Sequence, residues 1–213
     1  MSAAIVRQIS PTLATPFIER WHYSHHVPTG KNIFFGWLNH AELYAVSNYG
    51  IGVNNNQTAF LARITGLPVT NTNLMELKRL CRIGPRNEDL PLTKFLSRCH
   101  KILKSRFRIR FIVSFSDPAH GHNGGIYKAA GFRHLGQTDA GVEFRTSDGR
   151  SIHPRTLTNY AARLHCSFAD AVEYYGVERF KTVPKDRWFL DLGLIGLRKL
   201  FAALRKLLGG WLQ

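Results

Sequence analysis

The alternation of apolar and polar residues is clearest in the middle of the chain. Residues 74–83 and 111–116 are predicted as strands, and residues 92–107 between them have apolar side chains at helical spacing. A strand, a helix and a second strand in this order predict a parallel pair with a right-handed crossover. Asp117 directly follows the second strand, at the edge where open α/β sheets usually bind their ligands.

The N-terminal part has weaker patterns of the same two kinds. Thr15 followed by Pro16 is typical of a helix start, which predicts a helix over residues 15–23. Further elements are expected as strands at residues 3–9, 32–38 and 42–48, and as a short helix at residues 57–65.

Arg79 is a charged residue on a predicted apolar face of the strand 74–83. Strict alternation puts its side chain on the same face as Leu77 and Cys81, which are apolar. An arginine on a buried face is unfavourable unless an anion or a carboxylate meets it. A β-bulge in this strand would break the alternation and turn the arginine elsewhere.

The C-terminal part combines short strands with helical patterns. Strands are expected at residues 134–138, 142–146 and 150–153. Helices over 154–164 and 168–175 resemble a helix-turn-helix, although such pairs are also common in proteins that do not bind DNA. The apolar stretch 190–212 predicts a helix that packs on the domain or a second subunit, with a membrane surface as the alternative. We therefore expect an α/β domain over 1–153 and a helical extension over 154–213.

The net charge changes this picture most. The chain has 213 residues with 29 Lys and Arg against 14 Asp and Glu, a formal charge of +15 and a pI near 10.2. Such an excess favours a polyanionic partner, with nucleic acid first and an anionic membrane surface second. Three cysteines without paired spacing give no disulfide framework, and no signal-peptide pattern is present, so we expect a cytoplasmic protein.

Four short motifs occur in an order that resembles one family. They are Trp21-His-Tyr-Ser24, Glu76-Leu-Lys-Arg-Leu80, Ser114-Phe-Ser-Asp117 and Gly121-His-Asn-Gly124. Together they resemble the Mom proteins, phage and prophage enzymes that hypermodify adenine in DNA. The segment Tyr127-Lys-Ala-Ala-Gly-Phe132 is similar to the last helix-to-strand junction of GNAT-type acyltransferases. The resemblance implies a GNAT-like α/β fold: a mixed central sheet flanked by helices, here with a helical C-terminal extension.

The resemblance also implies which residues are catalytic. These are Tyr23, Glu76, Arg79, Asp117 and Tyr127. Tyr127 lies where GNAT-type enzymes often hold a general acid toward the CoA thiolate, and a phenol with a pKa near 10 donates rather than accepts a proton at neutral pH. Asp117 would accept a proton from the adenine N6 amino group or orient a base edge. The alternatives are an aromatic ring packed on the sheet and a turn-forming aspartate before proline.

A GNAT-like fold implies an acyl-CoA site, with acetyl-CoA as the donor. Its pyrophosphate is normally held by backbone N–H groups at a helix N-terminus. The loop of residues 84–93 lacks the closely spaced glycines usual there and contains two acidic residues. We assign cofactor binding to Arg86, Asn87, Thr93, Ser116 and Tyr127.

Histidines cluster around the first motif and near Asp117. Imidazole nitrogens and carboxylate oxygens suit iron or zinc, although scattered histidines more often lie on the surface or in hydrogen bonds. The resemblance to Mom proteins implies ferrous iron, and we assign His22 and His26 as its ligands.

The function expected from these features is modification of adenine N6 in double-stranded DNA in the host cytoplasm. By resemblance the product is a carbamoylmethyl group that shields phage DNA from restriction, and making it needs a nitrogen source or metal chemistry beyond acetyl transfer. The target base must leave the duplex, with aromatic residues in 21–23 and Tyr49 available for stacking. The rivals are an ordinary GNAT N-acetyltransferase acting on a protein or small amine, and a non-catalytic DNA-binding or membrane-peripheral protein. Whether the protein forms a homodimer stays open.

Overall fold

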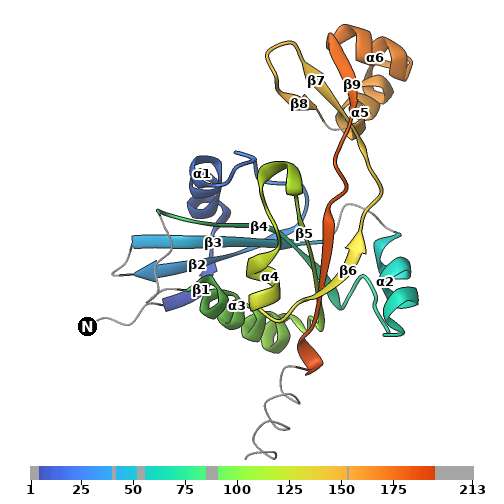
Figure 1. Cartoon of the computed structure of the whole chain (residues 1–213). Helices are drawn as coiled ribbons and strands as arrows, with labels where there is room; N and C mark the ends of the chain where they lie inside the picture. The colour runs from blue at the N-terminus through green and yellow to red at the C-terminus, as the bar shows by residue number, and fades with distance from the viewer. Residues whose placement is uncertain (1–4, 40–41, 52–55, 85–90, 153, 195–213) are drawn as a thin grey trace, which may run out of the picture. The chain divides into compact units, whose positions relative to one another are not determined.

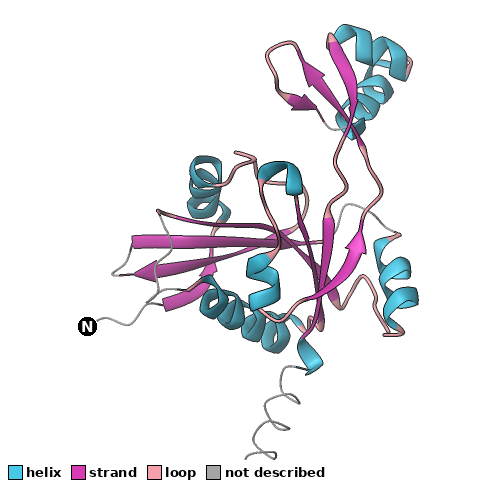
Figure 2. Cartoon of the chain, in the orientation of Figure 1, coloured by secondary structure: helices cyan, strands magenta, loops and turns pink. Residues whose placement is uncertain are grey.

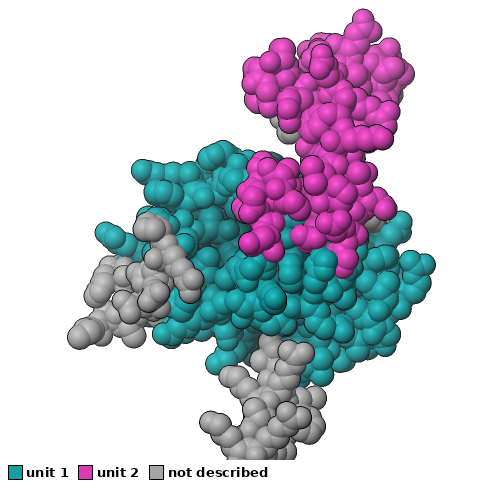
Figure 3. All heavy atoms as spheres, viewed as in Figure 1, with its two compact units in different colours: residues 1–116, 124–135, 187–213 teal, residues 117–123, 136–186 magenta. Residues whose placement is uncertain are grey.

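A computed structural model describes residues 5–39, 42–51, 56–84, 91–152 and 154–194 (Figure 1). The chain divides into two compact units, coloured separately in Figure 3. The first consists of residues 1–116, 124–135 and 187–213, and the second of residues 117–123 and 136–186. Residues 136–186 are thus an insertion into the first unit, and the loop of residues 117–123 groups with them.

A mixed sheet forms the centre of the first unit. Its described strands are β1 (Ile5–Ile9), β2 (Asn32–Asn39), β3 (Glu42–Gly50), β4 (Leu74–Arg82), β5 (Phe111–Ser116), β6 (Arg133–Gln137) and β10 (Asp186–Asp191), in the order β1-β2-β3-β4-β5-β10-β6. The first four strands pair antiparallel, and β4 pairs parallel with β5. The predicted parallel pair and the expected mixed sheet are confirmed.

Helices cover both faces of this sheet (Figure 2). They are α1 (Pro11–Trp21), α2 (Gln57–Thr65), α3 (Leu92–Phe107) and the short α4 (Gly125–Ala129). Adjacent residues of a strand point to opposite faces. Accordingly, Phe34 packs in the core that contains Phe17 and Ile18 of α1, whereas Phe35 packs with Phe95 and Leu96 of α3.

The first helix begins earlier than its sequence pattern predicted. Ser10 is the N-cap, its side chain accepts a hydrogen bond from the backbone N–H of Leu13, and Pro11 occupies the first helical position. Pro16 therefore lies inside α1, where it removes one helical hydrogen bond. The expected start at Thr15 was wrong because Ser10-Pro11 carries the same start signal one turn upstream.

A β-bulge explains the position of Arg79. Asn48 of β3 pairs with Arg79, but the next residue, Tyr49, pairs with Leu77, so one residue of β4 is passed over. Leu77 consequently packs in the core of α3, while Cys81 packs in the core of α1. In a regular strand these two residues would share a face. The expected common face of Leu77, Arg79 and Cys81 is therefore broken at the bulge.

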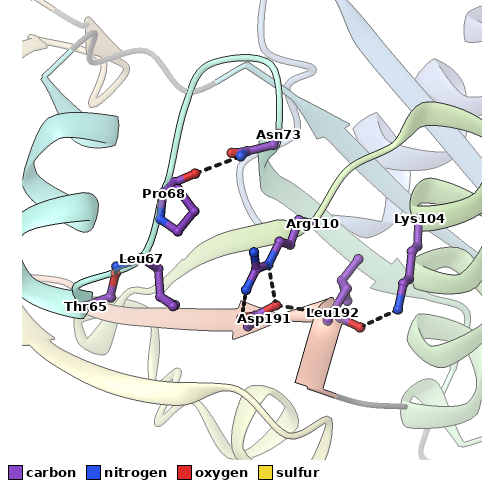
Figure 4. Close-up of polar contacts among 9 residues, drawn as sticks. Thr65, Leu67, Pro68, Asn73, Lys104, Arg110, Asp191 and Leu192 are labelled. Carbon is purple, nitrogen blue, oxygen red and sulfur yellow. Dashed lines mark hydrogen bonds and ion pairs between the residues drawn. The ribbon is translucent and has the colours of Figure 1, made fainter. Parts of the chain in front are cut away.

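The chain returns to the main sheet at β10, inside the segment 154–213 that was predicted as a helical extension. Trp188, Phe189 and Leu190 are buried there. Asp191 receives two hydrogen bonds from the guanidinium of Arg110, at 3.2 and 3.1 Å (Figure 4). A short apolar run is compatible with either a strand or a helix, and pattern alone does not decide between them.

The expected helix over 190–212 lies mostly outside the described residues. Among the residues that the structure describes, no helix is long and apolar enough to cross a membrane.

The second unit has its own small sheet and core. Strands β7 (Val142–Thr146), β8 (Ser151–Ile152) and β9 (Val177–Lys181) are ordered β8-β7-β9, with helices α5 (Pro154–Leu164) and α6 (Phe168–Tyr174). A capping box between Ser167 and Asp170 starts α6. The predicted helix pair is confirmed, whereas β9 was not anticipated. The buried residues of this unit's core are Phe144, Leu157, Ala161, Ala171 and Val177.

Candidate active site

The loop after α1 is bound to β4 through Arg79. The Arg79 guanidinium donates from Nε to the backbone oxygen of His26 at 3.0 Å and from Nη1 to the oxygen of Lys78 at 2.8 Å. Burial lowers the pKa of Arg79, and the nearby Tyr23 and Glu76 oppose that effect. Arginine stays protonated under these conditions, so a partly buried positive charge lies beside this loop.

Tyr127 presents its hydroxyl group to the same region. Its ring lies 5.5 Å from that of Phe132 and 5.9 Å from that of Trp188, which fixes its orientation. Burial raises the pKa of Tyr127, which the positive charge of Arg79 partly opposes. The phenol is therefore neutral at physiological pH and can donate its proton.

A buried serine connects Tyr127 to the backbone of β4. Ser114 is fully buried, hydrogen-bonds with Tyr127 and donates from Oγ to the backbone oxygen of Leu77 at 2.8 Å. Because its own proton is directed to Leu77, the Ser114 oxygen is available to accept from the phenol. These two hydrogen bonds link the Tyr127 hydroxyl through Ser114 of β5 to the backbone of β4.

Four of the five residues predicted as catalytic come together in the first unit. Tyr23, Glu76 and Arg79 all influence the ionisation of Tyr127, so the four groups form one electrostatic cluster. They come from the loop after α1, from β4 and from α4, and Tyr23 and Tyr127 are 104 positions apart in the sequence. Their catalytic roles stay a prediction.

Asp117, the fifth, belongs to the second unit. It is 8% exposed, and its carboxylate accepts a hydrogen bond from the backbone N–H of Ala119 at 3.1 Å and pairs with Lys185 Nζ at 2.9 Å. The aspartate therefore starts the turn before Pro118, as its alternative interpretation expected, and also forms an ion pair.

The backbone ladder between β4 and β5 is shorter than the two strands. Their ladder ends at the pair of Glu76 and Val113, although β4 continues to Arg82 and β5 to Ser116. Beyond that point, the side chain of Ser114 instead of a β5 amide satisfies the oxygen of Leu77. Backbone groups beyond the end of such a ladder can pair with an extended ligand.

The predicted cofactor residues are only partly assembled. Thr93 is half-buried in the first turn of α3, a 16-residue helix whose N-cap, Pro91, makes no side-chain capping bond. N–H groups of such a first turn can bind a phosphate. Ser116 is 2% exposed and accepts a hydrogen bond from Trp188 Nε1 at 2.9 Å, which favours a structural role. Arg86 and Asn87 lie outside the described residues.

The histidines do not form a metal site in the described part of the chain. No group of three or more His, Cys, Asp or Glu side chains that could hold a metal ion occurs there. His22 is buried, and its Nδ1 accepts a hydrogen bond from the backbone N–H of Ser24 at 3.1 Å. The backbone oxygen of His26, in turn, accepts from Arg79. These contacts shape the loop after α1, and the assignment of His22 and His26 as iron ligands stays a prediction.

Tyr49 also differs from its expected role. It is fully buried in the core beneath α3, 6.0 Å from the ring of His100, so it cannot stack on an extruded base. Trp21 and Tyr23 are 39% and 41% exposed, and their stacking role stays a prediction.

Trp188 is the residue that sequence reasoning missed. Its indole donates to Ser116, packs against Tyr127 and lies 5.0 Å from the ring of His134. Gly124 has φ +71°, and a Cβ added there would overlap this indole. The last glycine of the Gly121-His-Asn-Gly124 motif is therefore required by Trp188. The only sequence feature that could have pointed to Trp188 is its place as a single tryptophan in an apolar run.

The positive charge is unevenly distributed between the units. The second unit contains seven Lys and Arg against eight Asp and Glu, a formal charge of −1, so the rest of the chain carries +16. The helix pair α5–α6 therefore belongs to a unit without a basic excess. This distribution does not favour the helix-turn-helix interpretation, since DNA-binding modules usually carry a basic patch.

Solved structures with a similar fold are acetyltransferases. A mutant form of the spermidine/spermine N-acetyltransferase SpeG from Vibrio cholerae superposes with a TM-score of 0.50 at 9% identity, covering 92% of this chain and 99% of that chain. A chimera of that enzyme with hSSAT gives a TM-score of 0.50 at 7% identity, covering 89% and 96%. At such identities the likeness concerns the fold alone, and it confirms the expected GNAT-like α/β architecture.

Sequence comparison is more specific. The methylcarbamoylase Mom of Escherichia phage Mu is 26% identical over 155 residues, which are 71% of this chain and 61% of the relative, so the chain spans about three-fifths of that protein's length. The family model described as the Mom protein family matches residues 3–186. This match runs through both units and includes all four motifs, and the chain therefore belongs to the Mom protein family.

Proposed function

We propose that this protein is a transferase that modifies the N6 amino group of adenine in DNA. The observation that carries the proposal is the cluster of Tyr23, Glu76, Arg79 and Tyr127, drawn together from separate family motifs in the unit that holds the positive charge. The methylcarbamoylase activity named for the phage Mu relative gives the chemical class.

An acyl-CoA molecule would bind between β4 and β5, beyond the end of their ladder. The open edges of the two strands would pair with the extended arm of the cofactor, and the first turn of α3, including Thr93, would face its phosphates. Acetyl-CoA, when bound, supplies an activated acyl group. Tyr127 then serves as the general acid, because burial keeps its phenol protonated and Ser114 holds the hydroxyl in place.

Arg79 has an electrostatic role in this proposal. Its two hydrogen bonds in the described structure use two of its five N–H donors, and the rest can stabilise negative charge that develops near Tyr127. Its partial burial strengthens this effect, since charges interact more strongly away from bulk water.

DNA would bind through charge and aromatic stacking. The +16 charge outside the second unit would hold the phosphates without reading the sequence. Adenine N6 is paired inside the duplex, so the base must be extruded, and the exposed rings of Trp21 and Tyr23 can stack on it. Asp117 would accept a hydrogen bond from the amino group. A carbamoylmethyl product needs a nitrogen source besides the acetyl group.

The test is nucleoside mass spectrometry on plasmid DNA from cells that express the protein. We expect a heavier deoxyadenosine with the wild type and its loss with Tyr127→Phe, which removes one hydroxyl. Tyr160→Phe in the second unit is the matched control and should modify DNA normally. Unmodified DNA from cells with folded wild-type protein would refute the proposal. Acetyl transfer to an added amine in that case would indicate an ordinary N-acetyltransferase.

A further inference from the structure

The carboxylate of Asp117 has a partner on each oxygen. Oδ1 accepts a hydrogen bond from the backbone N–H of Ala119 at 3.1 Å, and Oδ2 pairs with Lys185 Nζ at 2.9 Å. The Asp117 side chain is 11% exposed and that of Lys185 37%. A charge-assisted contact on one oxygen and a backbone hydrogen bond on the other fix the direction of the carboxylate's remaining lone pairs.

Lys185 is itself held at the point where the chain enters and leaves the second unit. Its backbone N–H donates to Thr138 Oγ1 at 3.0 Å, and its backbone oxygen accepts from the N–H of Thr138 at 2.9 Å. Gln137 Nε2 also donates to Asp186 Oδ1 at 3.2 Å. These three bonds join the two ends of the insertion, residues 137–138 and 185–186, which we call the neck.

The ammonium group that pairs with Asp117 therefore belongs to the neck. Asp117 follows β5 directly, Asp186 begins β10, and β10 is the neighbour of β5 in the sheet. This topology brings Lys185 next to the aspartate although 68 positions separate them in the sequence. The loop of residues 117–123 accordingly groups with the second unit.

We propose that Lys185 is a positioning residue for Asp117, and this inference rests on the proposed function. Lys185 holds the carboxylate in one orientation, so that Asp117 presents an acceptor to the amino group of the target base. The second unit acts on the site in this view through its neck, which sets the position of the ammonium group.

The catalytic role is tested with Lys185→Met and Lys185→Arg, and Lys181→Met serves as control. Lys181 is an exposed lysine of β9, so its loss removes the same charge from the same unit. We expect Lys185→Met to slow DNA modification in cells about tenfold to a hundredfold, the range for a charge-assisted hydrogen bond. Lys185→Arg should recover most of the rate, and Lys181→Met should match the wild type. Duplex affinity of the purified proteins, from fluorescence anisotropy, should change less than twofold.

A double-mutant cycle of protein stability tests the ion pair independently of activity. Melting temperatures are measured for Asp117→Asn, Lys185→Met and the double variant. We expect the double variant to be no less stable than the less stable single variant, because both substitutions break the same interaction. Additive losses would overturn the pair, and an unchanged modification rate in Lys185→Met would overturn the positioning role. If the wild type modifies no DNA but the melting temperatures are not additive, the proposed function is refuted. The ion pair then has only a structural role.

Discussion

Gly124 gives the sharpest test of the packing beneath the candidate site. A Cβ added there would lie 2.7 Å from Trp188 Nε1 and closer still to the ring carbons, so Gly124→Ala must displace the indole. Displacement of Trp188 breaks its hydrogen bond to Ser116 and removes the support of Tyr127. Overpacking costs about 1–3 kcal/mol and the lost hydrogen bond about 1 kcal/mol.

Gly121 provides the matched control within the same motif. Both glycines have φ +71°, but a Cβ at Gly121 meets nothing within 4 Å. Gly121→Ala therefore carries only the backbone strain, about 1–2 kcal/mol, which both variants share.

The expected difference between the two variants is the Trp188 contribution alone. It amounts to about 2–4 kcal/mol of unfolding free energy, or a melting temperature lower by roughly 5–15 °C. Urea unfolding followed by circular dichroism measures this difference in free energy. DNA modification by Gly124→Ala should also be weaker than modification by Gly121→Ala. Equal losses in the two alanine variants would show that Trp188 does not require the glycine.

Two further predictions concern pH and salt. Burial lowers the pKa of His100 to about 3, so the folded protein binds its proton less readily than the unfolded chain, and stability should fall as the pH drops from about 6.5 toward 3. His100→Leu should reduce the pH dependence of the unfolding free energy, measured with urea, by up to about 1.4 kcal/mol per pH unit in this range. The same pH dependence in the variant and the wild type would contradict a buried neutral imidazole. Arg155→Ala and Arg163→Ala in the near-neutral second unit should change the duplex Kd less than twofold in anisotropy titrations, and a clearly reduced salt slope would place DNA on this unit.

The βαβ unit was predictable because its signals are local. Each element between β4 and β5 has its own hydrophobic period, and Asp117 follows the second strand wherever the rest of the chain lies. The grouping of Tyr23 with Arg79 and Tyr127 was anticipated only through the order of the family motifs. No periodicity in the sequence indicates that the loop after α1 folds onto β4.

Other features depend on partners distant in sequence. The bulge that separates Leu77 from Cys81 arises from the pairing of β3 with β4, which the alternation within β4 does not report. The apolar run around Trp188 becomes a strand because β5 and β6 offer free edges on either side. The ion pair of Asp117 with Lys185 requires both the insertion and that strand order.

The place of β10 in the sheet has a consequence for synthesis of the protein. The ribosome delivers β1 to β6 first, but β5 and β6 have no common neighbour until residues 186–191 emerge, after the whole insertion. During that interval the unpaired side of β5, with its buried Phe111 and Val113, is an open strand edge in a nascent chain. An insertion that folds early and closes its own neck shortens this exposure, since it brings the start of β10 back to the sheet.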